Sequence, residues 1–162
     1  ARDGLYSEKA GTIIRSILEN MEKHYPNRTL AIITPFRDTV RELQKRFCTS
    51  DIELDVTIET IDRIQGMTVD YAILYVPGRN PGFALEDRRF NVATSRSLST
   101  TLIISDIPLN EFHTVSPTVI QFVDKCDKYD GINNEPSPKS PFSHPITQVF
   151  LRCENRIIRT GV

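Results

Sequence analysis

The chain has 162 residues and a formal net charge of −1, a length that fits one domain with a substantial core. The near-neutral charge excludes a global field that would attract nucleic acid or membrane, so such binding must rest on local charge. No run of about 18 apolar residues occurs, so we expect no membrane span and no membrane partner. The first residues lack an initiator methionine and a signal-peptide core, so we expect an excised fragment.

Cysteines and histidines are few and scattered. The three cysteines form no CxxC pair, which favours reduced intracellular thiols over a disulfide framework. The three histidines are equally isolated, so no ligand pattern predicts a metal site. We expect a cytoplasmic protein, with the nucleus as the alternative in a eukaryotic source.

The first third of the chain predicts helix, strand and helix. Ser7 can cap a helix that runs to about His24, whose apolar residues recur at helical spacing. Residues 29–33 form a β-branched run typical of a strand buried on both faces. Pro35 is well placed at the start of a helix that runs to about Phe47. That helix carries a basic stripe, usually a solvated face: Arg37, Arg41 and Lys45.

The middle of the chain continues the alternation. Strands are expected at residues 54–59, 71–76 and 101–104, and helices at residues 86–97 and after Ser116. Strands that alternate with helices predict an α/β domain with a mainly parallel sheet. We expect this domain to span residues 1–131. Residues 132–162 would be a Pro/Ser-rich linker and a C-terminal β-like extension.

Polar residues follow several strands. In open parallel sheets, ligands bind beyond the carboxyl ends of the strands. Arginine suits phosphate oxygens, and Gly66 lets backbone approach a ligand closely. These features predict a phosphate-binding crevice, unless the arginines are surface partners of Glu86 and Asp87. The residues expected there are 34–37, 60–66 and a helix bearing Arg88, Arg89 and Arg96.

One familiar nucleotide-binding element is missing. No GxxxxGK[ST] loop occurs in the sequence, so the chain has no cradle for the α- and β-phosphates of a nucleotide. A complete NTPase site therefore cannot be built from this chain alone. We expect the isolated chain to show no ATPase activity.

Three stretches carry a resemblance to a known family. Residues 30–37 (LAIITPFR), 60–66 (TIDRIQG) and 89–97 (RFNVATSRS) resemble motifs IV, V and VI of superfamily 1 helicases, in the Upf-like branch (superfamily 1B). The order and the positions at strand ends also fit. The resemblance, over roughly residues 7–130, implies the C-terminal RecA-like (2A) domain, a three-layer α/β/α fold of the P-loop NTPase type with a mainly parallel sheet.

The resemblance implies roles in ATP use. Arg96 would be an arginine finger that reaches the γ-phosphate, and removing such a finger costs about 10³-fold or more in turnover. Gln65 and Gly66 would line the same cleft, and Arg89 would support the helix or the phosphate site. ATP with Mg²⁺ would be bound mainly by an N-terminal RecA-like domain of the same protein, absent from this sequence.

The resemblance also implies a contact with single-stranded nucleic acid. The residues expected to contact the strand are Thr34, Pro35, Phe36, Thr60 and Asp62. Backbone and hydroxyl contacts of this kind position a strand without reading its sequence.

Two positions depart from the family pattern. A glutamate expected to bind the ribose is replaced by Thr68, and the last arginine of motif VI is replaced by Leu98. The favoured interpretation is the C-terminal motor domain of an ATP-dependent DNA or RNA helicase or translocase. One alternative is a helicase-like module that binds nucleic acid or protein without productive hydrolysis. Another is an unrelated α/β domain that binds small phosphates.

Overall fold

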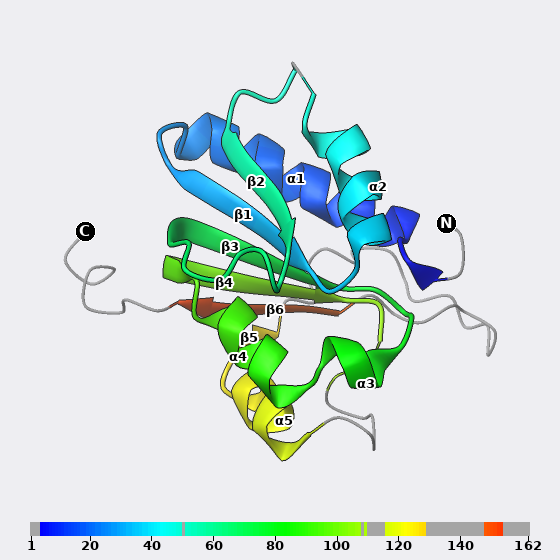
Figure 1. Cartoon of the computed structure of the whole chain (residues 1–162). Coiled ribbons are helices and arrows are strands. Elements are labelled where there is room, and N and C mark those ends of the chain that lie inside the picture. Colours follow the sequence, from blue (N-terminus) through cyan, green and yellow to red (C-terminus); the bar gives the residue numbers. More distant parts are fainter. Residues whose placement is uncertain (1–3, 50, 108, 110–115, 129–147, 154–162) are drawn as a thin grey trace, which may run out of the picture.

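The computed structural model describes residues 4–49, 51–107, 109, 116–128 and 148–153 (Figure 1). The helices are α1 (Glu8–His24), α2 (Arg37–Phe47), α3 (Pro81–Ala84), α4 (Asp87–Thr94) and α5 (Pro117–Asp124). The strands are β1 (Thr29–Thr34), β2 (Asp55–Thr60), β3 (Val69–Val76), β4 (Ser97–Ser105), β5 (Asp127–Lys128) and β6 (Gln148–Cys153).

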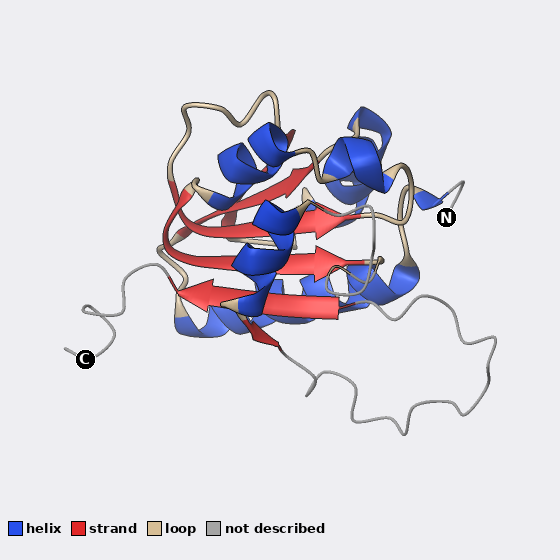
Figure 2. Ribbon diagram, turned by 90° about the horizontal axis from the view of Figure 1, so that it is seen from below, coloured by secondary structure: helices blue, strands red, loops and turns tan. Residues whose placement is uncertain are grey.

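One six-stranded sheet forms the centre of the fold, in the order β2-β1-β3-β4-β6-β5. The first four strands are parallel to their neighbours. Strand β6 runs antiparallel to both β4 and β5, as the one reversed long arrow in Figure 2 shows. The predicted α/β fold with a mainly parallel sheet is therefore confirmed.

Helices cover both faces of the sheet because the inner strands are apolar on both faces. Along β1, Leu30 and Ile32 belong to a core shared with α1 and α2. Ala31 and Ile33 belong to a second core, shared with α4, α5 and residues 61–64. Figure 1 shows the two pairs of helices on opposite sides of the sheet. The predicted three-layer α/β/α arrangement follows from these two cores.

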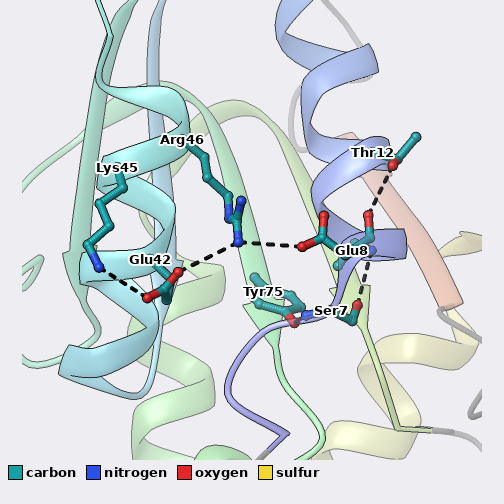
Figure 3. Close-up of polar contacts among 8 residues, drawn as sticks. Ser7, Glu8, Thr12, Glu42, Lys45, Arg46 and Tyr75 are labelled. Atoms are coloured by element: carbon teal, nitrogen blue, oxygen red, sulfur yellow. Dashed lines mark hydrogen bonds and ion pairs between the residues drawn. The ribbon is translucent and has the colours of Figure 1, made fainter. Parts of the chain in front are cut away.

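Helix α1 is fixed at its first turn. As predicted, Ser7 is the N-cap, and its side chain accepts a hydrogen bond from the Ala10 N–H at 3.1 Å. The helix ends at His24, also as predicted. Arg46 of α2 reaches Glu8 of α1 at 3.4 Å and Glu42 of its own helix at 3.7 Å (Figure 3). These contacts join the two helices on this face.

Several boundaries differ from those expected. The helix predicted at residues 86–97 is shorter, because Glu86 is its N-cap and Thr94 its last residue. Strand β4 is correspondingly longer than predicted, because it already pairs with Val69 at Ser97. Helix α2 begins at Arg37, two residues later than a start at Pro35.

The C-terminal extension contributes to the same sheet. Strand β6 lies between β4 and β5, so it is an internal strand. Of the predicted linker and extension, residues 132–162, the part at residues 132–147 lies outside the described residues, and the division at residue 131 stays a prediction. Within the described ranges, none of the helices has the length and apolar character needed to cross a bilayer.

Candidate functional site

The connection between β2 and β3, residues 61–68, is the centre of the candidate site; we call it the crossing loop. Strand β1 lies between the parallel strands β2 and β3. The loop must therefore pass from the carboxyl end of β2 to the amino end of β3 across β1. Ile61 and Ile64 are 2% and 1% exposed, whereas Asp62, Arg63 and Gln65 are exposed. The two isoleucines hold the loop on the sheet, and its polar side chains are exposed to solvent.

Two turns shape the crossing loop. The Thr60 carbonyl accepts hydrogen bonds from the N–H groups of Arg63 and Ile64, at 3.1 and 3.0 Å. Farther along, the Met67 N–H donates to the Ile64 carbonyl at 3.0 Å. Gly66 in this second turn has φ +87°, a conformation that side chains with a Cβ rarely adopt. Glycine at this position is thus required by the backbone.

Helix α4 lies beside the crossing loop. Glu86 caps it and accepts hydrogen bonds from the N–H groups of Arg88 and Arg89, at 3.3 and 3.4 Å. Phe90 and Ala93 are fully buried, in the core that also holds Ile61 and Ile64 of the loop. A pocket of about 380 Å³, which we call the polar pocket, lies between α4 and the crossing loop. It is lined by Ile61, Asp62, Gln65, Glu86, Arg88, Arg89 and Val92.

Arg89, which lines the polar pocket, has an unpaired donor. Its Nη1 forms an ion pair with Glu86 at 3.1 Å, and its guanidinium carbon lies 3.9 Å from the centroid of the Phe83 ring. Its Nε is buried and has no hydrogen-bond partner. Buried donors are normally paired, so this nitrogen is a donor left without an acceptor in the structure.

A second pocket of about 380 Å³ adjoins the first, and we call it the aromatic groove. It is lined by Pro35, Phe36, Arg37, Thr60, Asp62, Arg63, Asn80 and Phe83. The rings of Phe36 and Phe83 stack, with centroids 5.6 Å apart and an interplanar angle of 19°. Asp62 lines both pockets, so the two pockets share one residue of the crossing loop.

The structure brings most of the predicted site residues together. Gln65 and Arg89, expected to face ATP, line the polar pocket. Four of the residues expected to contact nucleic acid line the aromatic groove: Pro35, Phe36, Thr60 and Asp62. The fifth, Thr34, is fully buried and does not line it, and its Oγ1 has no hydrogen-bond partner. Its carbonyl accepts a hydrogen bond from Ile61, at 3.2 Å, where the crossing loop begins.

Arg96 lies elsewhere than expected. We predicted it at the carboxyl edge of the sheet, on a helix with Arg88 and Arg89. It instead follows the end of α4 and precedes β4, at the amino edge, where its carbonyl accepts a hydrogen bond from Val69 at 3.0 Å. The helix ends earlier than its sequence pattern indicated, which explains the difference. Neither pocket includes Arg96, and its Nε is buried without a partner.

Sequence reasoning missed two residues of the aromatic groove: Asn80 and Phe83. Asn80 has φ +45° and lies in the loop after β3. That loop leaves the carboxyl edge of the sheet, so the rule that ligands bind there would have included it. Phe83 was not assignable from sequence, because its partner Phe36 is 47 positions away and meets it only in the fold.

Charge alone does not select a ligand for the polar pocket. Two arginines and two carboxylates line it: Arg88, Arg89, Asp62 and Glu86. Among the described residues, no group of three or more His, Cys, Asp or Glu side chains is arranged to hold a metal ion. The distinguishing feature is therefore the unpaired Arg89 nitrogen beside a polar loop.

Part of the chain is similar to a known protein and to a known family. The chain is 30% identical over 108 residues to a protein of Saccharomyces cerevisiae named DNA polymerase alpha-associated DNA helicase A. That alignment covers 63% of the chain but only 16% of the yeast protein. The family described as "AAA domain" matches residues 3–107, which include α1 to β4 and both pockets. The match extends over more than half of the sequence, and the chain accordingly belongs to the AAA domain family.

Proposed function

We propose that this chain is the C-terminal motor domain of an ATP-dependent DNA or RNA helicase or translocase, in the Upf-like branch of superfamily 1. The observation that carries the proposal is the crossing loop, whose Asp62 lines both the polar pocket and the aromatic groove. A motor needs a nucleotide site and a strand site in mechanical contact. The similarity to a protein named as a DNA helicase supports the same function.

The polar pocket suits one side of a nucleotide. Its volume of about 380 Å³ falls within the roughly 300–1,000 Å³ of small-molecule sites. Arg89 offers a buried, unpaired nitrogen, whereas the sequence contains no phosphate-cradling loop. ATP with Mg²⁺, held mainly by an N-terminal RecA-like domain of the same protein, supplies the phosphoryl group that is transferred to water. Gln65, Gly66 and Arg89 contact it from this side.

Arg96 acts as the arginine finger in this proposal. Its guanidinium stabilises the charge that develops on the γ-phosphate during transfer. The turn that holds Arg96 is bonded to Val69, three positions after Gly66. Arg96 and the last turn of the crossing loop therefore lie at the same edge of the sheet.

The aromatic groove holds the single strand. Phe36 offers a ring face for a base, and such stacking is tolerant of sequence. Thr60, Pro35 and Asp62 flank the ring, and Thr34 supports the groove through its bond to Ile61. Residues 1–131 form the motor domain, and residues 132–162 extend it.

The test uses the full-length protein and the variant Arg96→Ala. Strand-stimulated ATP hydrolysis is expected to fall by about 10³-fold, while ATP affinity stays within a few-fold of wild type. The matched control is Arg41→Ala, because the Arg41 side chain is 69% exposed on α2 and pairs with Asp38 of its own helix. Normal turnover in Arg96→Ala would overturn the assignment.

A second candidate is a helicase-like module that binds nucleic acid or protein without hydrolysis. It is favoured by the position of Arg96 outside both pockets and by Thr68 in place of the family glutamate. In that case the full-length protein binds single strands with a strong salt dependence but hydrolyses no ATP above background. An unrelated phosphate-binding domain would show no salt-dependent affinity for single strands.

A further inference from the structure

Three side chains form a continuous stack between the two pockets. Arg89 lines the polar pocket, and its guanidinium carbon lies 3.9 Å from the Phe83 ring centroid. Phe83 lines the aromatic groove and stacks on Phe36, with centroids 5.6 Å apart. Phe83 is thus in contact with a residue of each pocket.

The Arg89 guanidinium has two competing sets of partners: Phe83 and Glu86 in the structure, or a phosphate in the polar pocket. In the structure its guanidinium rests on the Phe83 ring and pairs with Glu86, and its Nε has no partner. A phosphate oxygen in the polar pocket is a stronger partner for guanidinium than an aromatic face, because the bond is charge-assisted and can be bidentate. A nucleotide phosphate therefore draws the guanidinium away from the ring.

That displacement alters the aromatic groove. With the cation gone from one face, Phe83 loses the contact that fixes its angle against Phe36. Both rings are only partly buried, so they can reorient and present a different stacking surface to a base. Base–aromatic stacking depends on this ring geometry.

We propose that Phe83 is a positioning residue that couples nucleotide binding to single-strand affinity, through the stack Arg89–Phe83–Phe36. The inference rests on the proposed function, since it requires a nucleotide in one pocket and a strand in the other. The coupling is reciprocal, as binding linkage demands. A nucleotide changes strand affinity, and a strand changes nucleotide affinity by the same factor.

The experiment measures that factor in the full-length protein. The affinity for a fluorescent 20-nucleotide oligothymidylate is determined without nucleotide and with a non-hydrolysable ATP analogue plus Mg²⁺. Wild type is expected to show a ratio of about 5–150-fold between the two affinities, the usual range of allosteric coupling. Phe83→Leu, which keeps an apolar side chain but removes the ring, should bring the ratio close to one.

Three further variants sharpen the test. Phe83→Tyr keeps the ring and should keep the wild-type ratio. Arg89→Lys keeps the charge but loses the planar guanidinium, so it should lower the ratio even if Phe83→Leu fails to fold. Tyr25→Leu removes an aromatic ring that is 49% exposed, precedes β1 and lines neither pocket, and it should leave the ratio unchanged.

The outcomes separate the inference from the function beneath it. A wild type that shows strand-stimulated hydrolysis, with the same ratio in Phe83→Leu and Arg89→Lys, overturns the coupling role alone. A ratio close to one in Phe83→Tyr as well as in Phe83→Leu also overturns the coupling role, since the aromatic ring would then not be the source of the coupling. A wild type that neither binds the strand nor hydrolyses ATP overturns the proposed function and the inference together.

Discussion

The Tyr75 hydroxyl donates a hydrogen bond to Asp106 Oδ2 at 2.5 Å, in the buried layer between the sheet and α1. Ser7 completes this contact: its Oγ donates to Asp106 Oδ1 at 2.9 Å, and its N–H donates to the Tyr75 oxygen at 3.0 Å. Tyr75 lies at the end of β3, and Asp106 directly follows β4. The N-cap of α1 is therefore fixed to two strand ends at once.

Removing the Tyr75 hydroxyl should destabilise the fold. Tyr75→Phe loses two hydrogen bonds of a buried network, one of them to a carboxylate, so the free energy of unfolding should fall by about 1–3 kcal/mol. Urea denaturation of the protein would measure this change. Tyr25→Phe, at an exposed phenol, is the control and should stay within about 0.5 kcal/mol of wild type. Equal stability of the two variants would contradict the role of the network.

The same phenol predicts a dependence on alkaline pH. Burial, reinforced by the Asp106 charge, raises the pKa of Tyr75 well above its usual value. The folded state then holds the proton more tightly than the unfolded state. The stability that this difference provides is complete below the pKa of the Tyr75 phenol in the unfolded state. It is lost as pH rises toward the pKa of the phenol in the folded state. The advantage of wild type over Tyr75→Phe should shrink by about 1.4 kcal/mol per pH unit above about pH 10, measured by urea denaturation at successive pH values.

Gly11 in α1 leaves room for a neighbouring ring. A Cβ at this position would lie 1.7 Å from the Tyr6 hydroxyl oxygen and 2.8 Å from its Cζ, and Tyr6 is only 5% exposed. Alanine favours a helix by about 1 kcal/mol over glycine, but overpacking costs about 1–3 kcal/mol. We expect Gly11→Ala to lower the melting temperature, and Tyr6→Phe in the same chain to restore part of the loss. A more stable Gly11→Ala would show that Tyr6 moves without cost.

Asp70 connects the beginnings of β1 and β3. Its pKa is lowered chiefly by the hydrogen bond from the Thr29 N–H, with further contributions from the Thr29 hydroxyl and Arg28. Because the folded pKa is depressed, the carboxylate stabilises the fold above its unfolded pKa and loses this effect as pH falls through the folded pKa. Asp70→Asn should cost about 1 kcal/mol at pH 7. The gap between wild type and variant should close below about pH 4, and a gap independent of pH would refute the electrostatic account.

The crossing loop should be sensitive at Gly66. No heavy atom lies within 4 Å of the position that a Cβ would occupy, yet φ is +87°. The cost of Gly66→Ala is therefore backbone strain alone, about 1–2 kcal/mol. Gly82→Ala is the matched control, since a Cβ there meets equally open space without a positive φ. Thermal denaturation of both variants would compare them, and equal melting temperatures would argue against strain.

Strand positions were predictable from local pattern. The apolar runs of β1 and β3 could be located because they are buried on both faces and bounded by turn residues. The full length of β4 was not, since its first residues, such as Ser97 and Leu98, are polar or exposed. These residues are in a strand because β3 offers them hydrogen bonds, which no local pattern encodes.

The sequence predicted several residues of the candidate site, but it did not predict how all of them are arranged in space. Gln65 and Arg89 were expected to lie together and do so. Arg96 was misplaced because the end of α4 is set by the start of β4, a tertiary effect. The contact of Phe83 with both Arg89 and Phe36 depends on α3 returning over the sheet edge, so only the fold reveals it.

The crossing loop has no helix of its own to stabilise it. Its order depends on two buried isoleucines, Ile61 and Ile64, and on turns closed by few hydrogen bonds. Segments of this kind open locally at a lower free energy than the rest of a fold. Conservative changes such as Ile64→Val, which touch no ligand, are then expected to produce temperature-sensitive phenotypes, in which the protein remains folded but loses function on warming.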